Sequence, residues 1–402
     1  MVGATAVGVA RADDDPASLA KLGRAIFFDA ALSEPRGTSC SSCHDPARAF
    51  SGVDGSTNGL PRGSRPGHFA RRTSPSLLYL ELVPTFRLAQ TGDDPAPAPV
   101  GGFFWDGRAD SVRALARQPL LNPDEMNNAD GRALAVKVRR ADYGAAFARA
   151  FPGALDDPEA TLGAIGRALE AFLVTDDMAP FSSRYDAYLR KRGTLTSQEL
   201  RGLALFKDER KGNCAGCHLM DDGVADPKAS PFTDFSYDAV GVPRNARAPR
   251  RSPDLGLCER RDTETPTREA AYCASFRTPS LRNVAVRASY MHNGAFTSLR
   301  DVVAYYATRG TSPRRWYKGE VFDDVPRRYR GAVNTRTPPY DRRPGDAPAL
   351  DDAEIDAVVA FLGTLTDLTG SGSLPLANPG PPRGAWRSHA PLAPRPGSSR
   401  VK

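Results

Sequence analysis

Long hydrophobic runs are missing from this sequence of 402 residues. No stretch of eighteen or more apolar residues occurs, and a membrane-spanning helix requires a stretch of about that length. Basic helices interleaved with aromatic residues are missing as well, which argues against a nucleic-acid partner. The hydrophobic share of 40% and the charged share of 25% are ordinary. The sequence therefore indicates a globular chain with no membrane span, long enough for two domains.

Acidic residues are outnumbered, and the formal net charge is +7 with an isoelectric point near 9.1. A positive surface attracts acidic partners, such as an electron-donor protein. The alternative is that the excess lies in solvated loops and a tail, because many arginines occur in stretches rich in arginine and proline. These stretches are residues 241–252, 313–316, 326–343 and 383–400.

The N-terminus lacks the positive charge that begins a complete secretory signal. Residues 2–12 are nevertheless small and mostly apolar, and they end in the A-x-A pattern Ala10-Arg11-Ala12. We interpret residues 1–12 as a truncated signal peptide. The alternative is a plain terminus rich in alanine and glycine.

Cysteine is scarce, but four of the six cysteines lie in two C-x-x-C-H motifs. In this motif both thiols bond to the vinyl groups of a haem, and the histidine becomes an axial ligand of its iron. No second cysteine pair lies near either motif, which disfavours a tetrahedral zinc site. The motifs therefore predict two covalent haems c, attached at Cys40, Cys43, His44, Cys214, Cys217 and His218.

The two motifs belong to an internal repeat with a period of 174 residues. The segment LGRAIFFD at 22–29 precedes the first motif, and RGLALFKD at 201–208 precedes the second. Each repeat closes with an amphipathic helix, expected at about 159–176 and 352–367.

We therefore predict an all-α fold of two tandem cytochrome c-like domains, each with one covalent haem, long loops and little strand. The N-terminal domain is expected at residues 13–176 and the C-terminal domain at 177–367. Residues 368–402, rich in proline and arginine, are expected to form a loosely ordered tail.

Covalent haem attachment of this kind takes place outside the cytoplasm, which predicts a periplasmic protein. An oxidising compartment also permits disulfides. The two remaining cysteines, Cys258 and Cys273, would close a loop of about sixteen residues, and we expect them to be bonded. The alternative is two free thiols.

The order of these motifs resembles the bacterial di-haem cytochrome c peroxidase superfamily, and more specifically its MauG-like branch. The resemblance covers roughly residues 17–367. Besides the haem motifs it is carried by RRTSPSLLYL at 71–80, GGFFWDGRADS at 101–111, PLLNPDEM at 119–126 and FRTPSLRNVAVRASYMHNGAFTSLRDVVAYY at 276–306.

The resemblance implies an enzyme that reduces hydrogen peroxide to water at the N-terminal haem, with electrons relayed through the C-terminal haem. The reductant would be a small redox protein, either a cytochrome c or a cupredoxin. One alternative is a MauG-like oxidase that uses peroxide to modify a protein substrate, and another is a non-catalytic electron carrier. A monomer or a homodimer is expected.

The resemblance also assigns roles to residues near the N-terminal haem. Trp105 matches the tryptophan that couples the two haems, although from the residue alone a core aromatic would be favoured. Glu125 matches a distal glutamate that moves a proton between the peroxide oxygens; an exposed surface acid is the alternative. Pro119 matches a proline that lines the same pocket.

The sixth ligand of the C-terminal haem distinguishes the branches of the superfamily. Peroxidases place a methionine fourteen residues after His292, whereas this chain has Tyr306 there, as MauG-like members do. A phenolate lowers the iron potential, and methionine raises it. Met291 and Tyr305 are the rival ligands, and an open site is the remaining alternative.

His68 lies in the loop where peroxidase members carry a displaceable distal ligand. Its spacing is unusual, so a loop histidine beside a permanently open N-terminal haem is the other interpretation, which we slightly favour.

Several positions depart from the family pattern. Thr73, Arg287 and Ser289 replace an asparagine, a threonine and a proline that help to bind an inter-haem calcium, partly through backbone oxygens, so this calcium is a plausible but weaker expectation. Gly212 stands where MauG has a surface tryptophan that draws electrons from its protein substrate. Leu115 replaces a pocket glutamine, and Gln118 is out of register.

Overall fold

The structure is a computed structural model that describes residues 15–52, 58–90, 97–249, 252–260 and 269–368. Within these ranges helices dominate and strands are few, which confirms the predicted helix-rich fold with little strand. The helices are α1 (Pro16–Phe28), α2 (Val112–Leu121), α3 (Gly131–Arg140), α4 (Gly144–Ala150), α5 (Pro158–Leu173), α6 (Arg184–Leu189), α7 (Ser197–Lys207), α8 (Leu299–Thr308), α9 (Pro313–Trp316) and α10 (Asp352–Gly363). The strands are β1 (Arg87–Ala89), β2 (Ala98–Val100), β3 (Tyr237–Asp238) and β4 (Phe276–Arg277).

Each repeat is built around one close helix crossing. A Cβ atom on Gly23 of α1 would lie 1.9 Å from the carbonyl oxygen of Ala168 in α5. A Cβ atom on Gly202 of α7 would lie 2.0 Å from the carbonyl oxygen of Ala357 in α10. Glycine at these two positions therefore lets the opening helix of each repeat touch the backbone of its closing helix.

Each crossing encloses three phenylalanine rings whose centroids lie 5.3 to 6.4 Å apart. The rings extend two separate hydrophobic cores, one made of buried residues between 19 and 178 and the other between 185 and 365. The rings are Phe27, Phe50 and Phe172 in the first core and Phe206, Phe232 and Phe361 in the second.

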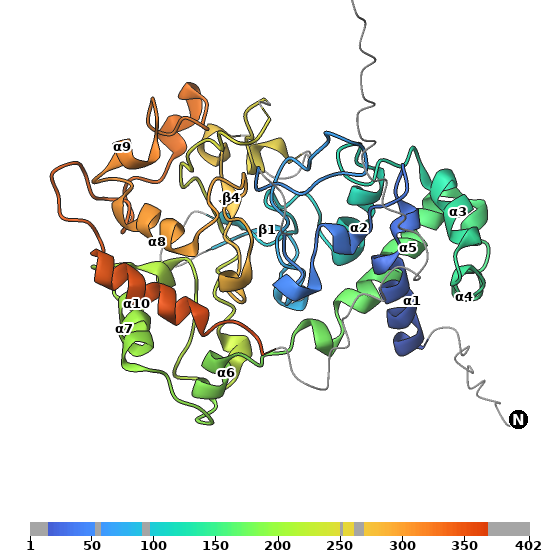
Figure 1. The fold of residues 1–402 in the computed structure, drawn as a ribbon, viewed down its shortest axis with the longest axis horizontal. Coiled ribbons are helices and arrows are strands. Elements are labelled where there is room, and N and C mark those ends of the chain that lie inside the picture. The colour runs from blue at the N-terminus through green and yellow to red at the C-terminus, as the bar shows by residue number, and fades with distance from the viewer. Residues whose placement is uncertain (1–14, 53–57, 91–96, 250–251, 261–268, 369–402) are drawn as a thin grey trace, which may run out of the picture.

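The two cores lie side by side, with α1 to α5 on one side of Figure 1 and α6 to α10 on the other. We call these parts the N-terminal half and the C-terminal half. The domain limits given above stay predictions, and the expected signal segment and nearly all of the expected tail lie outside the described residues.

The seam between the halves is made by loops and short strands. β1 pairs with β2 in the N-terminal half, and β3 pairs with β4 in the C-terminal half. A bridge between Val100 and Ser236 joins the two ribbons, and the Tyr237 hydroxyl donates to the carbonyl oxygen of Gly101 at 2.6 Å. The loops that follow the haem motifs of both halves therefore meet at one place.

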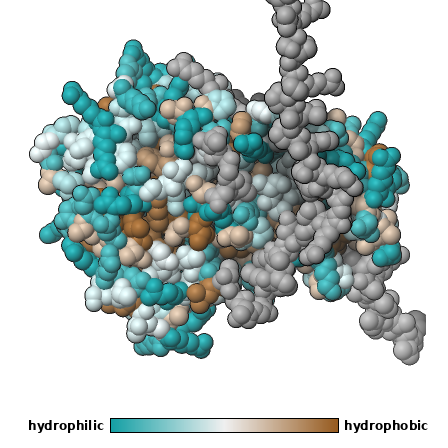
Figure 2. Space-filling view, in the orientation of Figure 1, coloured by the Kyte–Doolittle hydropathy of each residue, from teal (hydrophilic) through white to brown (hydrophobic). Residues whose placement is uncertain are grey.

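The face shown in Figure 2 is mainly hydrophilic, with hydrophobic residues visible in its central part. In the part of the chain that the structure describes, every helix is too short or too polar to cross a bilayer.

Candidate functional site

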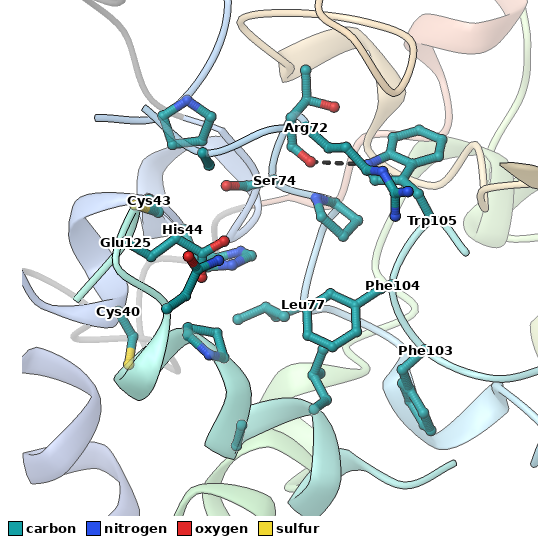
Figure 3. Close-up of a pocket in the computed structure, with 18 of the residues that line it drawn as sticks. Cys40, Cys43, His44, Arg72, Ser74, Leu77, Phe103, Phe104, Trp105 and Glu125 are labelled. Carbon is teal, nitrogen blue, oxygen red and sulfur yellow. Dashed lines mark hydrogen bonds between the residues drawn. The ribbon is translucent and has the colours of Figure 1, made fainter. Parts of the chain in front are cut away.

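A cavity of about 760 Å³ opens inside the N-terminal half, and the first C-x-x-C-H motif lines it. Cys40, Cys43 and His44 share its wall with Glu125 and Trp105. Figure 3 shows the motif and Glu125 on one side of the view and Trp105 on the other. The residues that the sequence assigned to the peroxide site are thus brought together, although they are up to 85 positions apart.

The ring of His44 is held in the orientation that an iron ligand needs. Its Nδ1 atom lies 2.9 Å from the carbonyl oxygen of Phe50, whose backbone takes the left-handed conformation with φ at 53°. A ring nitrogen facing a carbonyl carries the proton, which leaves Nε2 free to bind metal. Burial lowers the pKa of His44 to about 4, so the imidazole is neutral, as metal binding requires.

A second, smaller cavity of about 170 Å³ lies in the C-terminal half and repeats this arrangement. Cys214, Cys217 and His218 line it. Nδ1 of His218 lies 3.0 Å from the carbonyl oxygen of Phe232, whose φ is 54°, and burial lowers the pKa of the imidazole. Because two thiols and a neutral histidine are presented together in each cavity, the residues fit one covalently attached haem in each.

Arg277, which lies at the seam between the halves, is a second reason to place a haem in each cavity. It lines both cavities, and burial lowers the pKa of its guanidinium. Among the described residues no carboxylate forms an ion pair with it. A buried cation needs an anionic partner, and the propionate groups of a haem are carboxylates.

Glu125 is positioned by the loop that follows α2. The carbonyl oxygen of Pro119, inside α2, accepts from Met126 N at 3.2 Å, and the carbonyl oxygen of Glu125 accepts from Ser64 N at 2.7 Å. Pro119 also lines the cavity, as the family pattern implies. Burial raises the pKa of the Glu125 carboxyl, and the nearby Arg108 guanidinium opposes that rise.

Trp105 lies between the two cavities and lines both. Its indole Nε1 donates to the carbonyl oxygen of Thr73 at 2.9 Å, which Figure 3 marks as a dashed line. Its own carbonyl oxygen accepts from Arg277 N at 2.8 Å. Only 8% of its surface is exposed, so the ring is fixed in the seam.

Tyr306 lies on α8 and lines the second cavity together with His218. Its neighbour Tyr305 points the other way, because the Tyr305 hydroxyl contacts the carbonyl oxygens of Val240 and Gly241 at 2.9 and 2.8 Å. Tyr305 is not part of the cavity wall. Of the two rival ligands, only Met291 also lines the cavity.

A further aromatic, Tyr340, stands beside Tyr306 in the second cavity, with ring centroids 5.6 Å apart. Burial raises the pKa of both phenols. Tyr340 lies within the stretch 326–343, which is rich in proline and arginine and which the sequence pattern assigned to solvated loop, so its place in the cavity could not be read from that pattern.

His68 lies outside the first cavity as the structure describes it. Its Nδ1 atom is 2.8 Å from a carboxylate oxygen of Asp124, the neighbour of Glu125. This position favours the loop interpretation over a ligand role.

Four further residues lie in or next to the walls of the cavities. Leu115 lines the first cavity, whereas the Gln118 amide oxygen instead accepts from Arg108 Nε at 2.8 Å. Arg108 itself lines the cavity and was missed, although it belongs to the FFWDGR segment. Gly212 lines the second cavity, where an added Cβ would lie 3.0 Å from the Leu205 carbonyl oxygen.

The side chains expected near a calcium ion do not form a calcium site. Hydroxyl groups of Thr73 and Ser289 donate to the carbonyl oxygens of Met291 and Gly59, both at 2.8 Å. The third side chain, Arg287, is a cation. In the described part of the chain no cluster of three carboxylate, histidine or cysteine side chains is arranged to hold a metal ion.

Cys258 and Cys273 form a disulfide, with Cα atoms 4.7 Å apart. Cys258 and the next two residues, Glu259 and Arg260, line the first cavity although they belong to the C-terminal half. Arg72 anchors the segment before them, donating to both carboxylate oxygens of Asp254 at 2.6 and 2.7 Å.

A family model described as di-haem cytochrome c peroxidase matches residues 17–194. The methylamine utilization protein MauG of Paracoccus denitrificans is 38% identical over 383 residues, 89% of this chain and 90% of that protein. The cytochrome c551 peroxidase of Pseudomonas aeruginosa is 30% identical over 286 residues, 71% of this chain and 70% of that protein.

Among solved structures, the di-haem peroxidase BthA from Burkholderia thailandensis is 52% identical and superposes with a TM-score of 0.83. The match covers 90% of this chain and 89% of that one. A tyrosine-to-methionine variant of the same protein matches equally well. The relatives thus include proteins named as peroxidases and proteins named MauG.

Proposed function

Because the chain belongs to the MauG-like branch of the bacterial di-haem cytochrome c peroxidase superfamily, we propose that it reduces hydrogen peroxide to water with two covalent haems c. Each turnover takes two electrons and two protons. Cys40, Cys43 and His44 would hold the haem that binds peroxide, and Cys214, Cys217 and His218 would hold the haem that relays electrons. The relay between them runs through Trp105, and the electrons come from a small redox protein.

One observation carries the proposal: Trp105 lines both cavities, and Glu125 shares the first of them with Cys40, Cys43 and His44. A carboxylate and an electron relay at one C-x-x-C-H site are what peroxide cleavage needs. A simple electron carrier needs neither, which makes the non-catalytic alternative the weakest.

Glu125 serves as the proton-transfer group in this proposal. Its carboxylate accepts a proton from one peroxide oxygen and returns it to the other as the O–O bond breaks. Burial raises the pKa of the Glu125 carboxyl toward neutral pH, and a group with such a pKa can both accept and donate a proton. Arg108 limits the rise and keeps the group ionisable.

Tyr306, which shares the second cavity with His218, would supply a protein ligand to the C-terminal iron. Burial raises the pKa of its phenol, so without a metal the hydroxyl keeps its proton. A ferric ion held here would supply the positive charge that a buried phenolate requires. A phenolate ligand lowers the iron potential, which favours storing an oxidising equivalent over supplying an electron.

The second candidate is an oxidase that uses peroxide to modify a protein. Tyr306 in the second cavity and the 38% identity to MauG favour it. Gly212, which stands where MauG has a tryptophan for its substrate, argues against the same substrate. For either function we propose a periplasmic location, because both haems are attached there.

The experiment mixes the fully ferric protein with one equivalent of peroxide and follows the Soret and near-infrared bands. Tyr306→Phe and Tyr306→Met are compared with Tyr305→Phe, the matched control just outside the cavity. Wild type and the control should react without prior reduction, whereas both Tyr306 variants should show an altered C-terminal haem. If the wild-type protein stays inert until one haem is reduced, Tyr306 is not the ligand. The protein would then be classed as an ordinary di-haem peroxidase, and Met291 would be the next ligand to test.

A further inference from the structure

Arg287 is a partly buried cation at the seam between the two cavities. It lines the second cavity, and its presence also lowers the pKa of His44 in the first. Burial lowers the pKa of the Arg287 guanidinium to about 10, and no carboxylate among the described residues forms an ion pair with it. A buried charge in this position must find its compensation elsewhere.

The guanidinium finds that compensation in carbonyl oxygens from both halves. Its Nη2 atom donates to Ser74 O at 3.2 Å and its Nε atom to Ser289 O at 3.4 Å. Ser74 follows Thr73, whose carbonyl oxygen receives the Trp105 indole. The backbone at Thr73 and Ser74 is thus held by two hydrogen-bond donors, the Trp105 indole and the Arg287 guanidinium.

We propose that Arg287 is a built-in cation that takes the place of an inter-haem calcium ion and keeps Trp105 in register between the cavities. A calcium ion prefers oxygen ligands, several of them anionic. Here the hydroxyl groups of Thr73 and Ser289 point their protons at backbone carbonyls, and the Ser74 carbonyl already faces a positive charge. Arg287 is a positioning residue, and it plays this part whatever reaction the cavities carry out.

The first test uses wild-type holoprotein and measures bound metal and chelator sensitivity. Elemental analysis should find no stoichiometric calcium, and EGTA should leave the Soret spectrum and the melting temperature unchanged. One calcium per chain, or a spectral change with EGTA, would overturn the proposal. The outcome is independent of peroxide turnover, so it separates this inference from the proposed function.

The second test replaces the cation. Arg287→Lys keeps the charge and should hold the potentials of the two haems close to wild type. Arg287→Thr removes the charge and supplies a hydroxyl oxygen, so its altered potentials and lowered melting temperature should be restored by added calcium, which stabilises the form that binds it.

Arg309→Thr is the matched control, because Arg309 likewise donates to two carbonyl oxygens, those of Val240 and Asn334, but is buried inside the C-terminal half. It should show no calcium response. If Arg287→Thr responds to calcium no more than Arg309→Thr does, the guanidinium pairs with something else, such as a haem carboxylate, and the replacement of calcium is refuted. If Arg287→Thr does not fold, the metal content of wild type and the potentials of Arg287→Lys still decide.

Discussion

The substitution Trp105→Phe tests the relay directly, because it keeps an aromatic ring at the seam and removes the indole N–H. In wild type that group donates to Thr73 O at 2.9 Å, in surroundings that leave Trp105 only 8% exposed. Phenylalanine is also harder to oxidise than tryptophan. The change therefore affects stability and electron transfer by separate physical causes.

The stability cost follows from the lost hydrogen bond. Removing the donor leaves the buried Thr73 carbonyl unsatisfied, which costs about 1–3 kcal/mol, and the smaller ring adds a packing loss. Trp316→Phe is the matched control: its indole donates to Thr308 Oγ1 at 3.0 Å, and Trp316 lines neither cavity in the described structure. The Thr308 hydroxyl keeps its own hydrogen bond to Ala304 O when the indole is removed. The stability lost in Trp316→Phe should therefore be close to the net value of one ordinary hydrogen bond, about 0.5–1.5 kcal/mol.

The assay is rapid mixing of each ferric holoprotein with one equivalent of peroxide, together with a denaturant titration. In wild type and Trp316→Phe the bands of both haems should change together. In Trp105→Phe the N-terminal haem should still react, while the response of the C-terminal haem is lost or greatly delayed. If the C-terminal haem responds as fast in Trp105→Phe as in the control, Trp105 is not the relay, and the seam must be crossed elsewhere.

Three further substitutions test the site and the fold. Glu125→Gln should slow the peroxide reaction in rapid mixing by roughly 10²–10⁴-fold with unchanged haem content; because burial raises its pKa, the wild-type rate should fall as pH falls through that raised value, and the variant should lose this dependence. Normal peroxide kinetics in the variant would remove the residue from the mechanism. Replacing Cys258 and Cys273 by serine should lower the free energy of unfolding by about 3 kcal/mol for a loop of this length, and thiol labelling of unreduced wild type should find no free thiol; two labelled thiols would contradict the bond. Gly202→Ala should destabilise the protein in a denaturant titration by about 1–3 kcal/mol or more, because its Cβ would lie 2.0 Å from a backbone carbonyl oxygen of α10; Gly163→Ala, with open space at its Cβ, is the control and should cost nothing.

The local parts of this structure were predictable from the sequence. The capping box at Thr196 and Glu199 marks the start of α7, and the structure contains both of its hydrogen bonds. The helices expected at 159–176 and 352–367 appear as Pro158–Leu173 and Asp352–Gly363, so their starts were close and their ends too late. Helix starts carry capping side chains, whereas these ends carry no comparable signal.

The rest of the site depends on contacts between distant segments, for which a single sequence has no local pattern. Arg72 meets Asp254 across 182 positions, and the periodicity of neither segment indicates it. Arg287 was recognisable as a departure from a calcium-binding pattern, but its carbonyl partners, Ser74 and Ser289, depend on how the two halves meet at the seam. Tyr340 was hidden because its segment has the composition of a solvated loop.

The wall of the first cavity has a consequence for the order in which this protein matures. Cys258, Glu259 and Arg260 line that cavity, yet they are made more than two hundred residues after Cys43 and His44. A chain that has emerged only as far as its first haem motif has the means to attach a haem, but it lacks one side of the chamber around it. The first cavity is therefore closed only once part of the C-terminal half has been made, and the second cavity, whose wall extends to Leu362, is completed later still.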